Sequence, residues 1–269
     1  MSRRTLFFCF ITGLLAGCLT PVGPPPSVPA TRSLAGVHPP LSRAGDMAVY
    51  VVRNAYNSEP RGEVSYKVEK IDGDQTVVAV TASSPSAGLA HTEVYAAYGN
   101  WLRHPLLNHD MAVDYDFAPP YPAYPFPLDP GKSWSQRVNA SNPQTGTTYS
   151  VRVEGQVLGY ERITVPAGAF DVVRIVRRIY AGDWNGFLQE TNIAETEWYA
   201  PELGRAVRLE SNSNWIDTSR SLGGGGFFGG GILRNNMVMR GDWNVYELTS
   251  YQIDGRSAGP ASAAVPAPR

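Results

Sequence analysis

The sequence predicts an all-β protein with a single antiparallel domain, folded as an open or partly closed β-barrel or a sandwich. Strand-like runs separated by turn residues recur along the chain from about Asp46 onward. No apolar pattern indicates an amphipathic helix of about ten residues or more. The 27 glycines and 22 prolines are above average and favour strands and turns over helices.

The chain begins with a targeting signal, expected over residues 1–17. Arg3 and Arg4 form a positive start, and the apolar run TLFFCFITGLLAG that follows is too short to span a bilayer comfortably. The run ends in LAGC at 15–18, which resembles the lipobox of bacterial lipoproteins. The resemblance implies cleavage before Cys18 and acylation of Cys18, with several acyl chains giving stable membrane anchoring. The alternative is an ordinary secretory signal with a chance cysteine.

Residues 18–45 are predicted to form the lipidated cysteine and a proline-rich tether. Its prolines favour an extended, poorly packing chain that holds the domain away from the membrane. Position 19 is leucine, where an aspartate would favour retention in the inner membrane of enteric-type bacteria. The resemblance therefore implies an outer-membrane location, with the protein facing the periplasm.

The ordered domain is predicted over 46–255, and the small, proline-bearing tail 256–269 is expected to be disordered. Its clearest strand is GTTYSVRVEGQVLGYERITV, in which Tyr149, Val151, Val153 and Val157 share one face. Asp72-Gly73 between two strand-like runs predicts a hairpin. The further strand-like segments are 46–54, 62–71, 75–83, 91–99, 111–117, 169–184, 187–200, 205–215 and 235–253.

Two insertions interrupt this rhythm. Residues 117–134 place six prolines among aromatic residues, which excludes a central strand and predicts a rigid crossover, a polyproline-like surface or a cap on one end of the barrel. Residues 221–236 place seven glycines around Phe227 and Phe228. Phe227 and Phe228, with Tyr121, Tyr124 and Phe126 of the first insertion, are the candidate residues for contact with a ligand or a membrane. A loop without function is the alternative for 221–236.

Three stretches in the second half of the chain carry a family resemblance: FPLDPGKSW, ITVPAGAFDVVRI and TEWYAPELGRAVRLE. Together they resemble the TapB-like group of bacterial envelope β-proteins over roughly residues 126–212. The resemblance implies a fold and an envelope location and does not imply an activity. By strand alternation, Trp198 and Tyr199 are expected to point to opposite faces, one into the core and one outward.

Several site classes find no support in the sequence. Cys9 and Cys18 are the only cysteines, so the mature domain holds no disulfide, thiolate nucleophile or zinc–thiolate site. A net charge of -1 excludes the broad basic surface of a nucleic-acid-binding protein. His104 and His109, with Asp114 and Asp116 nearby, match no standard metal-ligand spacing. No metal, cofactor or catalytic residue is predicted.

One pair of carboxylates is a candidate for acid–base chemistry. Glu195 and Glu197 share a strand face, as acid–base chemistry on a polysaccharide would need, but a solvated face paired with arginines such as Arg174 and Arg178 is favoured. The sequence thus predicts a non-enzymatic envelope lipoprotein with a binding or structural β-domain. The alternatives are a carrier for an apolar ligand such as a lipid and, less favoured, a polysaccharide-acting enzyme. The expected partners are the membrane, through acylated Cys18, and a lipid or an envelope protein.

Overall fold

A computed structural model describes residues 21–36, 38, 41–109, 111–181, 190–217 and 237–259. Cys18, Phe227 and Phe228 lie outside the described residues. In the described part the chain is built from strands and one short 3-10 helix, η1 (Ala97–Gly99), and no helix there is long and apolar enough to cross a bilayer. The strands are β1 (Ser27–Pro29), β2 (Met47–Asn54), β3 (Pro60–Asp72), β4 (Gln75–Ala82), β5 (His91–Tyr95), β6 (Trp101–Asn108), β7 (Met111–Tyr121), β8 (Ser133–Ser141), β9 (Thr148–Val165), β10 (Gly168–Ala181), β11 (Thr191–Ala200), β12 (Arg205–Asp217), β13 (Met237–Ile253) and β14 (Arg256–Ala258).

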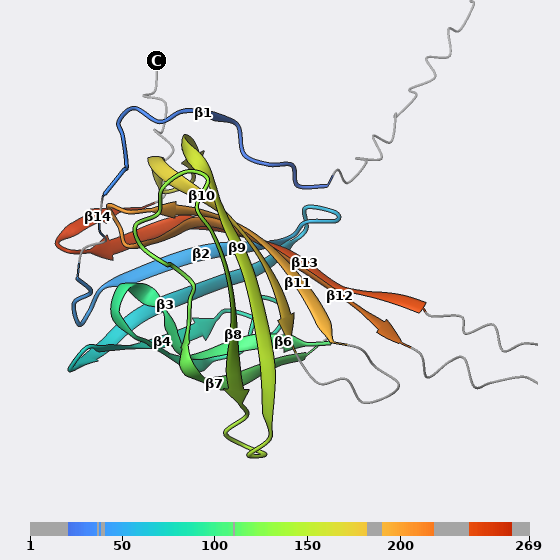
Figure 1. Cartoon of the computed structure of the whole chain (residues 1–269). Coiled ribbons are helices and arrows are strands. Elements are labelled where there is room, and N and C mark those ends of the chain that lie inside the picture. Colours follow the sequence, from blue (N-terminus) through green and yellow to red (C-terminus); the bar gives the residue numbers. More distant parts are fainter. Residues whose placement is uncertain are drawn as a thin grey trace, which may run out of the picture.

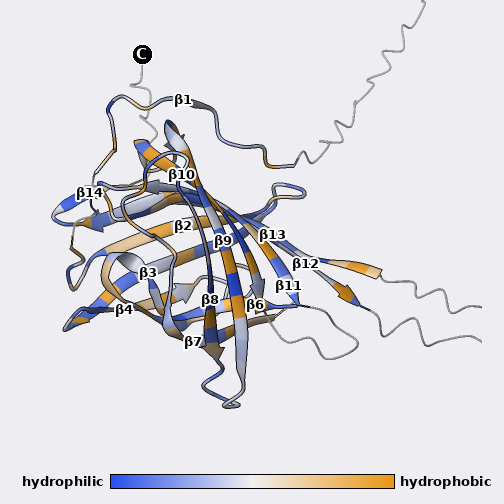
Figure 2. Ribbon diagram, in the orientation of Figure 1, coloured by the Kyte–Doolittle hydropathy of each residue, from blue (hydrophilic) through white to orange (hydrophobic). Residues whose placement is uncertain are grey.

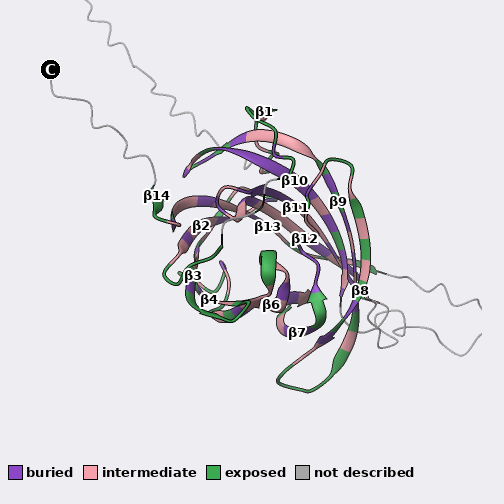
Figure 3. Cartoon of the chain, turned by 60° about the vertical axis from the view of Figure 1, so that its left-hand side comes forward, coloured by how far each residue is buried: buried purple, intermediate pink, exposed green. Residues whose placement is uncertain are grey.

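The strands form a closed barrel, which confirms the predicted fold class. Twelve of them, β2 to β13, follow one another round the ring, and β13 pairs with β2 from Asn244↔Asn54 to Gln252↔Met47 to close it. Every pairing is antiparallel, and Figure 3 shows the strands curving round a common interior. Closure joins the first and last strands of the ring, so neither is left as a free edge of an open sheet.

The local patterns in the sequence account for individual strands. Along β9, Val151, Val153 and Val157 are buried on the face that alternation predicts, and Figure 2 shows hydrophobic and hydrophilic residues alternating along this strand. Gly155 continues the same face, where the Trp134 indole covers it so closely that a Cβ atom would lie 2.2 Å from the ring. The predicted hairpin is also present, since Asp72 pairs with Gln75 across Gly73-Asp74.

The proline-rich segment differs from its prediction, because its described part packs along the barrel (Figure 1). β1 pairs with residues 161–163 of β9, beyond the end of the pairing between β8 and β9. Asp171 accepts hydrogen bonds from the backbone and hydroxyl of Thr31, and Leu34 is buried. The segment therefore covers a strand edge that β8 leaves free. At the other terminus, β14 forms within the predicted disordered tail by pairing with β13.

The first insertion also has a defined position. β7 continues through Phe117 to Tyr121, and the rest of the insertion crosses the end of the barrel at which β7 ends and β8 begins (Figure 1). Tyr121 is fully buried and stacks on Trp101 with ring centroids 4.2 Å apart, and Phe126 packs against Tyr199. These contacts agree with the prediction that its aromatic residues cap one end of the barrel.

Candidate functional site

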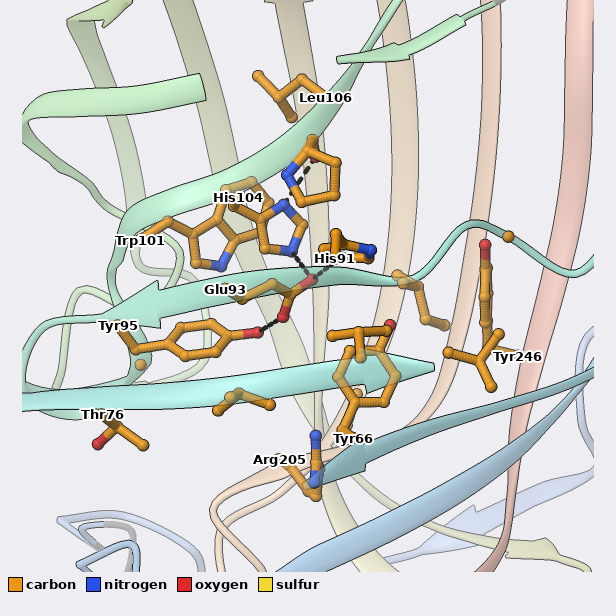
Figure 4. A pocket seen from close by; sticks show the side chains of 18 of the residues that line it. Tyr66, Thr76, His91, Glu93, Tyr95, Trp101, His104, Leu106, Arg205 and Tyr246 are labelled. Carbon is orange, nitrogen blue, oxygen red and sulfur yellow. Dashed lines mark hydrogen bonds and ion pairs between the residues drawn. The ribbon is translucent and has the colours of Figure 1, made fainter. Parts of the chain in front are cut away.

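The interior of the barrel is hollow. It holds a cavity of about 1150 Å³, lined by residues of β2 to β7 and of β10 to β13. Ligand-binding cavities for small molecules commonly measure about 300–1,000 Å³, so this cavity has room for a ligand of substantial size. The cavity is the candidate functional site, and Figure 4 shows part of its wall from close by.

Much of the wall is aliphatic. Alternation along β3 and β4 directs Val64, Val68, Val78 and Val80 inward, where they form one packed cluster, and Leu106 adds to the wall from β6. Several apolar side chains in the lining are strongly exposed to solvent, up to 87% for Leu41. These residues are Leu41, Ile71, Leu89, Tyr98 and Met111. Apolar side chains thus extend from the buried wall to the solvent-exposed margin of the cavity.

A buried carboxylate lies at the centre of the polar part of the wall. Glu93 of β5 is 1% exposed, and its Oε1 lies 2.9 Å from His91 Nε2 and 3.4 Å from His104 Nε2. Its Oε2 accepts a hydrogen bond from the Tyr95 hydroxyl. The His104 ring stacks flat on Trp101 with centroids 3.7 Å apart, which fixes its position (Figure 4).

The hydrogen bonds determine where the protons of this cluster lie. The Nδ1 atoms of His91 and His104 donate to the carbonyls of Leu89 and Pro105, because a carbonyl can only accept. A neutral ring with its proton on Nδ1 would turn a lone pair toward Glu93. A protonated His91 ring instead donates to the carboxylate from Nε2, so its positive charge neutralises Glu93.

The pKa shifts agree with this arrangement. Burial alone would raise the pKa of Glu93, but the charge of His104 and the hydrogen bonds from His91 and Tyr95 outweigh it and hold this pKa below its ordinary value. Burial alone would lower the pKa of His91, but the hydrogen bonds to Glu93 and to the Leu89 carbonyl raise it above its ordinary value. Each shift favours the ionised form of its group.

The cluster should make stability depend on pH. The Glu93 contribution is present above the ordinary pKa of a glutamate and is lost as pH falls through its lowered pKa. The His91 contribution is present below the ordinary pKa of a histidine and is lost as pH rises through its raised pKa. Both are present at mildly acid pH, so we expect the free energy of unfolding to be about 1 kcal/mol larger near pH 5.5 than near pH 8.

Urea denaturation at the two pH values tests this expectation, with Glu93→Gln as the test variant and the half-exposed Glu154→Gln as its control. In Glu93→Gln the pKa of His91 is no longer raised, so the loss of stability toward pH 8 should disappear. Glu154→Gln should keep it. An unchanged pH dependence in Glu93→Gln would show that the cluster is not its source.

A second buried charge cluster joins β10 and β11. Arg177 binds both Glu195, at 3.0 Å, and Glu197, and it also donates to the Ala123 carbonyl at 3.2 Å. The Tyr124 hydroxyl donates to Glu197 as well. Glu195 and Glu197 share a face as predicted, but the prediction of a solvated face was wrong. Closure of the barrel turns that face inward, so the arginine that pairs with them is Arg177.

A third charged group in the wall has no acidic partner. Arg205 begins β12, and its guanidinium lies 5.2 Å from the ring centroid of Tyr66 and 5.6 Å from that of Tyr50. Its Nε is buried and makes no hydrogen bond, and no carboxylate of the described residues forms an ion pair with it. Figure 4 shows Arg205 beside Tyr66, below the strand that carries Glu93.

The candidate ligand-contact residues from the sequence are divided by the structure. Tyr124 lines the cavity, whereas Tyr121 lies in the aromatic cluster with Trp101 and Phe126 packs in another cluster with Tyr199 and Leu34. Trp198 and Tyr199 belong to different clusters, but both are 1% exposed, so the prediction that one points outward to solvent was wrong.

The histidines and aspartates of 104–116 do not come together as a metal site. His104 faces Glu93 inside the barrel, Asp116 binds Arg103 at 2.6 Å, and His109 packs against Trp215. Across the residues that the structure describes, no group of three or more His, Cys, Asp or Glu side chains is arranged to hold a metal ion.

Sequence reasoning missed the polar residues that matter most here. His91, Glu93 and Tyr95 alternate with Thr92 and Val94 along β5, and this pattern is the same for a solvated face and for an inward polar face. Arg205 follows the glycine of the TEWYAPELG stretch, and no sequence motif marks it as a binding residue. The signal that could have identified them was a polar residue at every second position of a strand in a chain expected to form a barrel.

Two solved structures resemble this chain at low sequence identity. No family model matches the chain, and none of the curated proteins matches it, so the TapB-like resemblance stays a prediction. One similar solved structure is a candidate lipoprotein from Parabacteroides distasonis, 14% identical with a TM-score of 0.43, covering 81% of this chain and 98% of that one. Another is a candidate exported protein with a YmcC-like fold from Bacteroides fragilis, 13% identical with a TM-score of 0.42, covering 83% and 99%.

Proposed function

We propose that this chain is a non-enzymatic lipoprotein of the bacterial outer membrane, facing the periplasm, whose barrel carries an amphipathic small molecule. The observation on which the carrier role rests is the cavity of about 1150 Å³. A barrel with a purely structural role would be filled by its own side chains. The envelope location rests on the signal-like residues 1–17 and on Cys18 in its lipobox-like setting.

The composition of the wall favours an amphipathic ligand over a purely apolar one. The valines of β3 and β4 offer a surface for an apolar group, and Glu93, Arg177 and Arg205 place charge in the same cavity. Buried polar groups favour a ligand that can form hydrogen bonds with them. The exposed apolar residues at the margin, such as Leu41 and Leu89, provide contacts for such a molecule as it enters.

The pairing of the interior carboxylates supports a non-enzymatic role. Glu195 and Glu197 are bound by Arg177, and Glu93 is bound by His91 and Tyr95. A general acid or base must exchange protons with its substrate, and carboxylates held in ion pairs are poorly placed for that step. The polysaccharide-acting enzyme is accordingly the less favoured alternative.

Native mass spectrometry of the mature chain, purified from bacterial envelopes and released from detergent micelles in the instrument, tests the carrier role. We expect a small molecule to remain bound at about one copy per chain, and extraction of the denatured protein then identifies it. Ser211→Trp, which places an indole in the cavity, should abolish this binding. Asn212→Trp, one residue further along β12 and outside the cavity lining, is the matched control.

Two outcomes would contradict the proposal. If no small molecule is bound to the wild-type chain, the carrier role loses its main support. Equal occupancy in Ser211→Trp and in wild type would place the molecule outside the cavity. Circular dichroism of both variants establishes that the strands are intact.

A further inference from the structure

We infer that Arg205 binds the anionic headgroup of the ligand, so that the barrel selects amphiphiles with a carboxylate or phosphate group. This inference rests on the proposed carrier function and names the class of molecule carried. It starts from Arg205, the one arginine of the cavity lining for which the described residues supply no acidic partner.

Two arginines of the described residues, Arg177 and Arg208, are buried, and both have carboxylate partners. Arg177 binds the carboxylates of Glu195 and Glu197, and Arg208 binds those of Glu210 and Glu247. Two carboxylates therefore accompany each guanidinium. Arg205 has none among the described residues, and its Nε is left without an acceptor. Because a buried charge is costly without a partner, an anion from outside the chain is the expected occupant.

The surroundings of Arg205 hold it in place without neutralising it. The rings of Tyr50 and Tyr66 lie within 5.6 Å of its guanidinium, and aromatic faces attract cations. Tyr50 is itself fixed, since its hydroxyl donates to the Ala206 carbonyl at 2.7 Å. A guanidinium that is oriented in advance and retains its charge is suited to bind an anion with little loss of side-chain freedom.

The other basic side chains of the wall, His91, His104 and Arg177, do not compete for the same anion. The rings of His91 and His104 face Glu93, and Arg177 faces Glu195 and Glu197. A planar guanidinium binds a carboxylate or a phosphate through two parallel hydrogen bonds, and both groups are headgroups of common amphiphiles. The apolar chain of such a molecule would then lie along the inward valines of β3 and β4, which line the same cavity.

A series of headgroups on one chain length tests this inference on the wild-type protein. Isothermal titration calorimetry would compare dodecanoate, dodecyl phosphate, dodecan-1-ol and dodecyltrimethylammonium, each below its micelle-forming concentration. We expect the anionic compounds to bind at least about tenfold more tightly than the alcohol, and the cationic compound to bind most weakly. The tighter of the two anions distinguishes a fatty acid from a phosphate-bearing lipid as the source of the headgroup.

Arg205→Gln is the test variant, and Arg103→Gln, which removes a partly exposed arginine paired with Asp116, is its matched control. In Arg205→Gln the affinity for both anions should fall by about 10- to 100-fold and that for dodecan-1-ol should change less than about twofold. Arg103→Gln should behave as wild type. Arg205→Lys, which keeps the charge without the planar fork, serves if the glutamine variant does not fold, and should retain only part of the preference for anions.

The outcomes separate this inference from the carrier function. If the alcohol and the cationic compound bind as tightly as the anions, the anion preference is wrong and the carrier function stands. If the preference for anions persists unchanged in Arg205→Gln, another residue binds the headgroup. If no dodecyl compound binds the folded wild-type protein, the carrier function fails and this inference fails with it.

Discussion

Replacing Arg177 with methionine is expected to lower the free energy of unfolding by about 3–5 kcal/mol. Arg177 and Glu197 are each only 3% exposed in their side chains, and Glu195 is 11% exposed. Removing the guanidinium leaves two carboxylates beside each other in the barrel wall without a counter-charge. The Ala123 carbonyl also loses its donor, so the insertion over the end of the barrel loses one of its hydrogen bonds to the barrel wall.

Equilibrium urea denaturation measures this effect. Arg103→Met is the matched control, because Arg103 also binds a carboxylate through two hydrogen bonds, but about 41% of its side chain is exposed. Exposed pairs of this kind contribute about 0–1 kcal/mol, so the control should be close to wild type. If the two variants lose similar amounts of stability, the Arg177 cluster does not stabilise the barrel as its burial indicates.

Replacing Trp198 with alanine should also cost about 3–5 kcal/mol of unfolding free energy. Trp198 is 1% exposed, and its Nε1 donates to Glu161 at 2.6 Å. The guanidinium groups of Arg174 and Arg208 lie within 5.5 Å of its ring centroid. The substitution removes the largest fully buried side chain and leaves Glu161 without this donor, and alanine cannot fill the space.

Trp198→Phe separates the two parts of this effect. Phenylalanine keeps most of the buried ring and loses only the hydrogen bond to Glu161, so we expect a cost of about 1–2 kcal/mol. Thermal denaturation followed by near-ultraviolet circular dichroism would rank the variants, with alanine far below phenylalanine and phenylalanine below wild type. Equal losses in both variants would mean that the hydrogen bond, and not packing, carries the contribution of Trp198.

Much of the barrel could be predicted because strands and hairpins have recognisable local sequence patterns. The buried valines of β9 recur at every second position where the strand is regular, and Asp72-Gly73 marks the turn between β3 and β4. The insertion 117–134 was excluded as a central strand, which holds between Tyr121 and Ser133 but was wrong for its first residues, because β7 continues through Phe117 to Tyr121. In each case the interaction that determines the structure lies within a few residues of the chain.

Contacts between distant segments were not predictable in this way. Val22 donates to the Ala55 carbonyl at 2.9 Å, and Arg208 reaches the Gly23 carbonyl, so a segment with the composition of a spacer is held on the barrel. Its prolines predicted an extended chain, and β1 is extended. Composition carries no information on the free edge of β9 that this extended chain covers.

The sequence by itself determined that the chain forms antiparallel strands, where most of them lie, and which residues alternate along each one. Only the tertiary structure decided which of the two faces is inside. A polar face such as His91, Glu93 and Tyr95 has the same period whether it meets water or a closed interior. Pairing of β2 with β13, the first and last strands of the ring, closes it and turns that face inward, together with Glu195, Glu197 and Arg205. The cavity and its charges therefore follow from closure, which depends on hydrogen bonds between strands far apart in the chain.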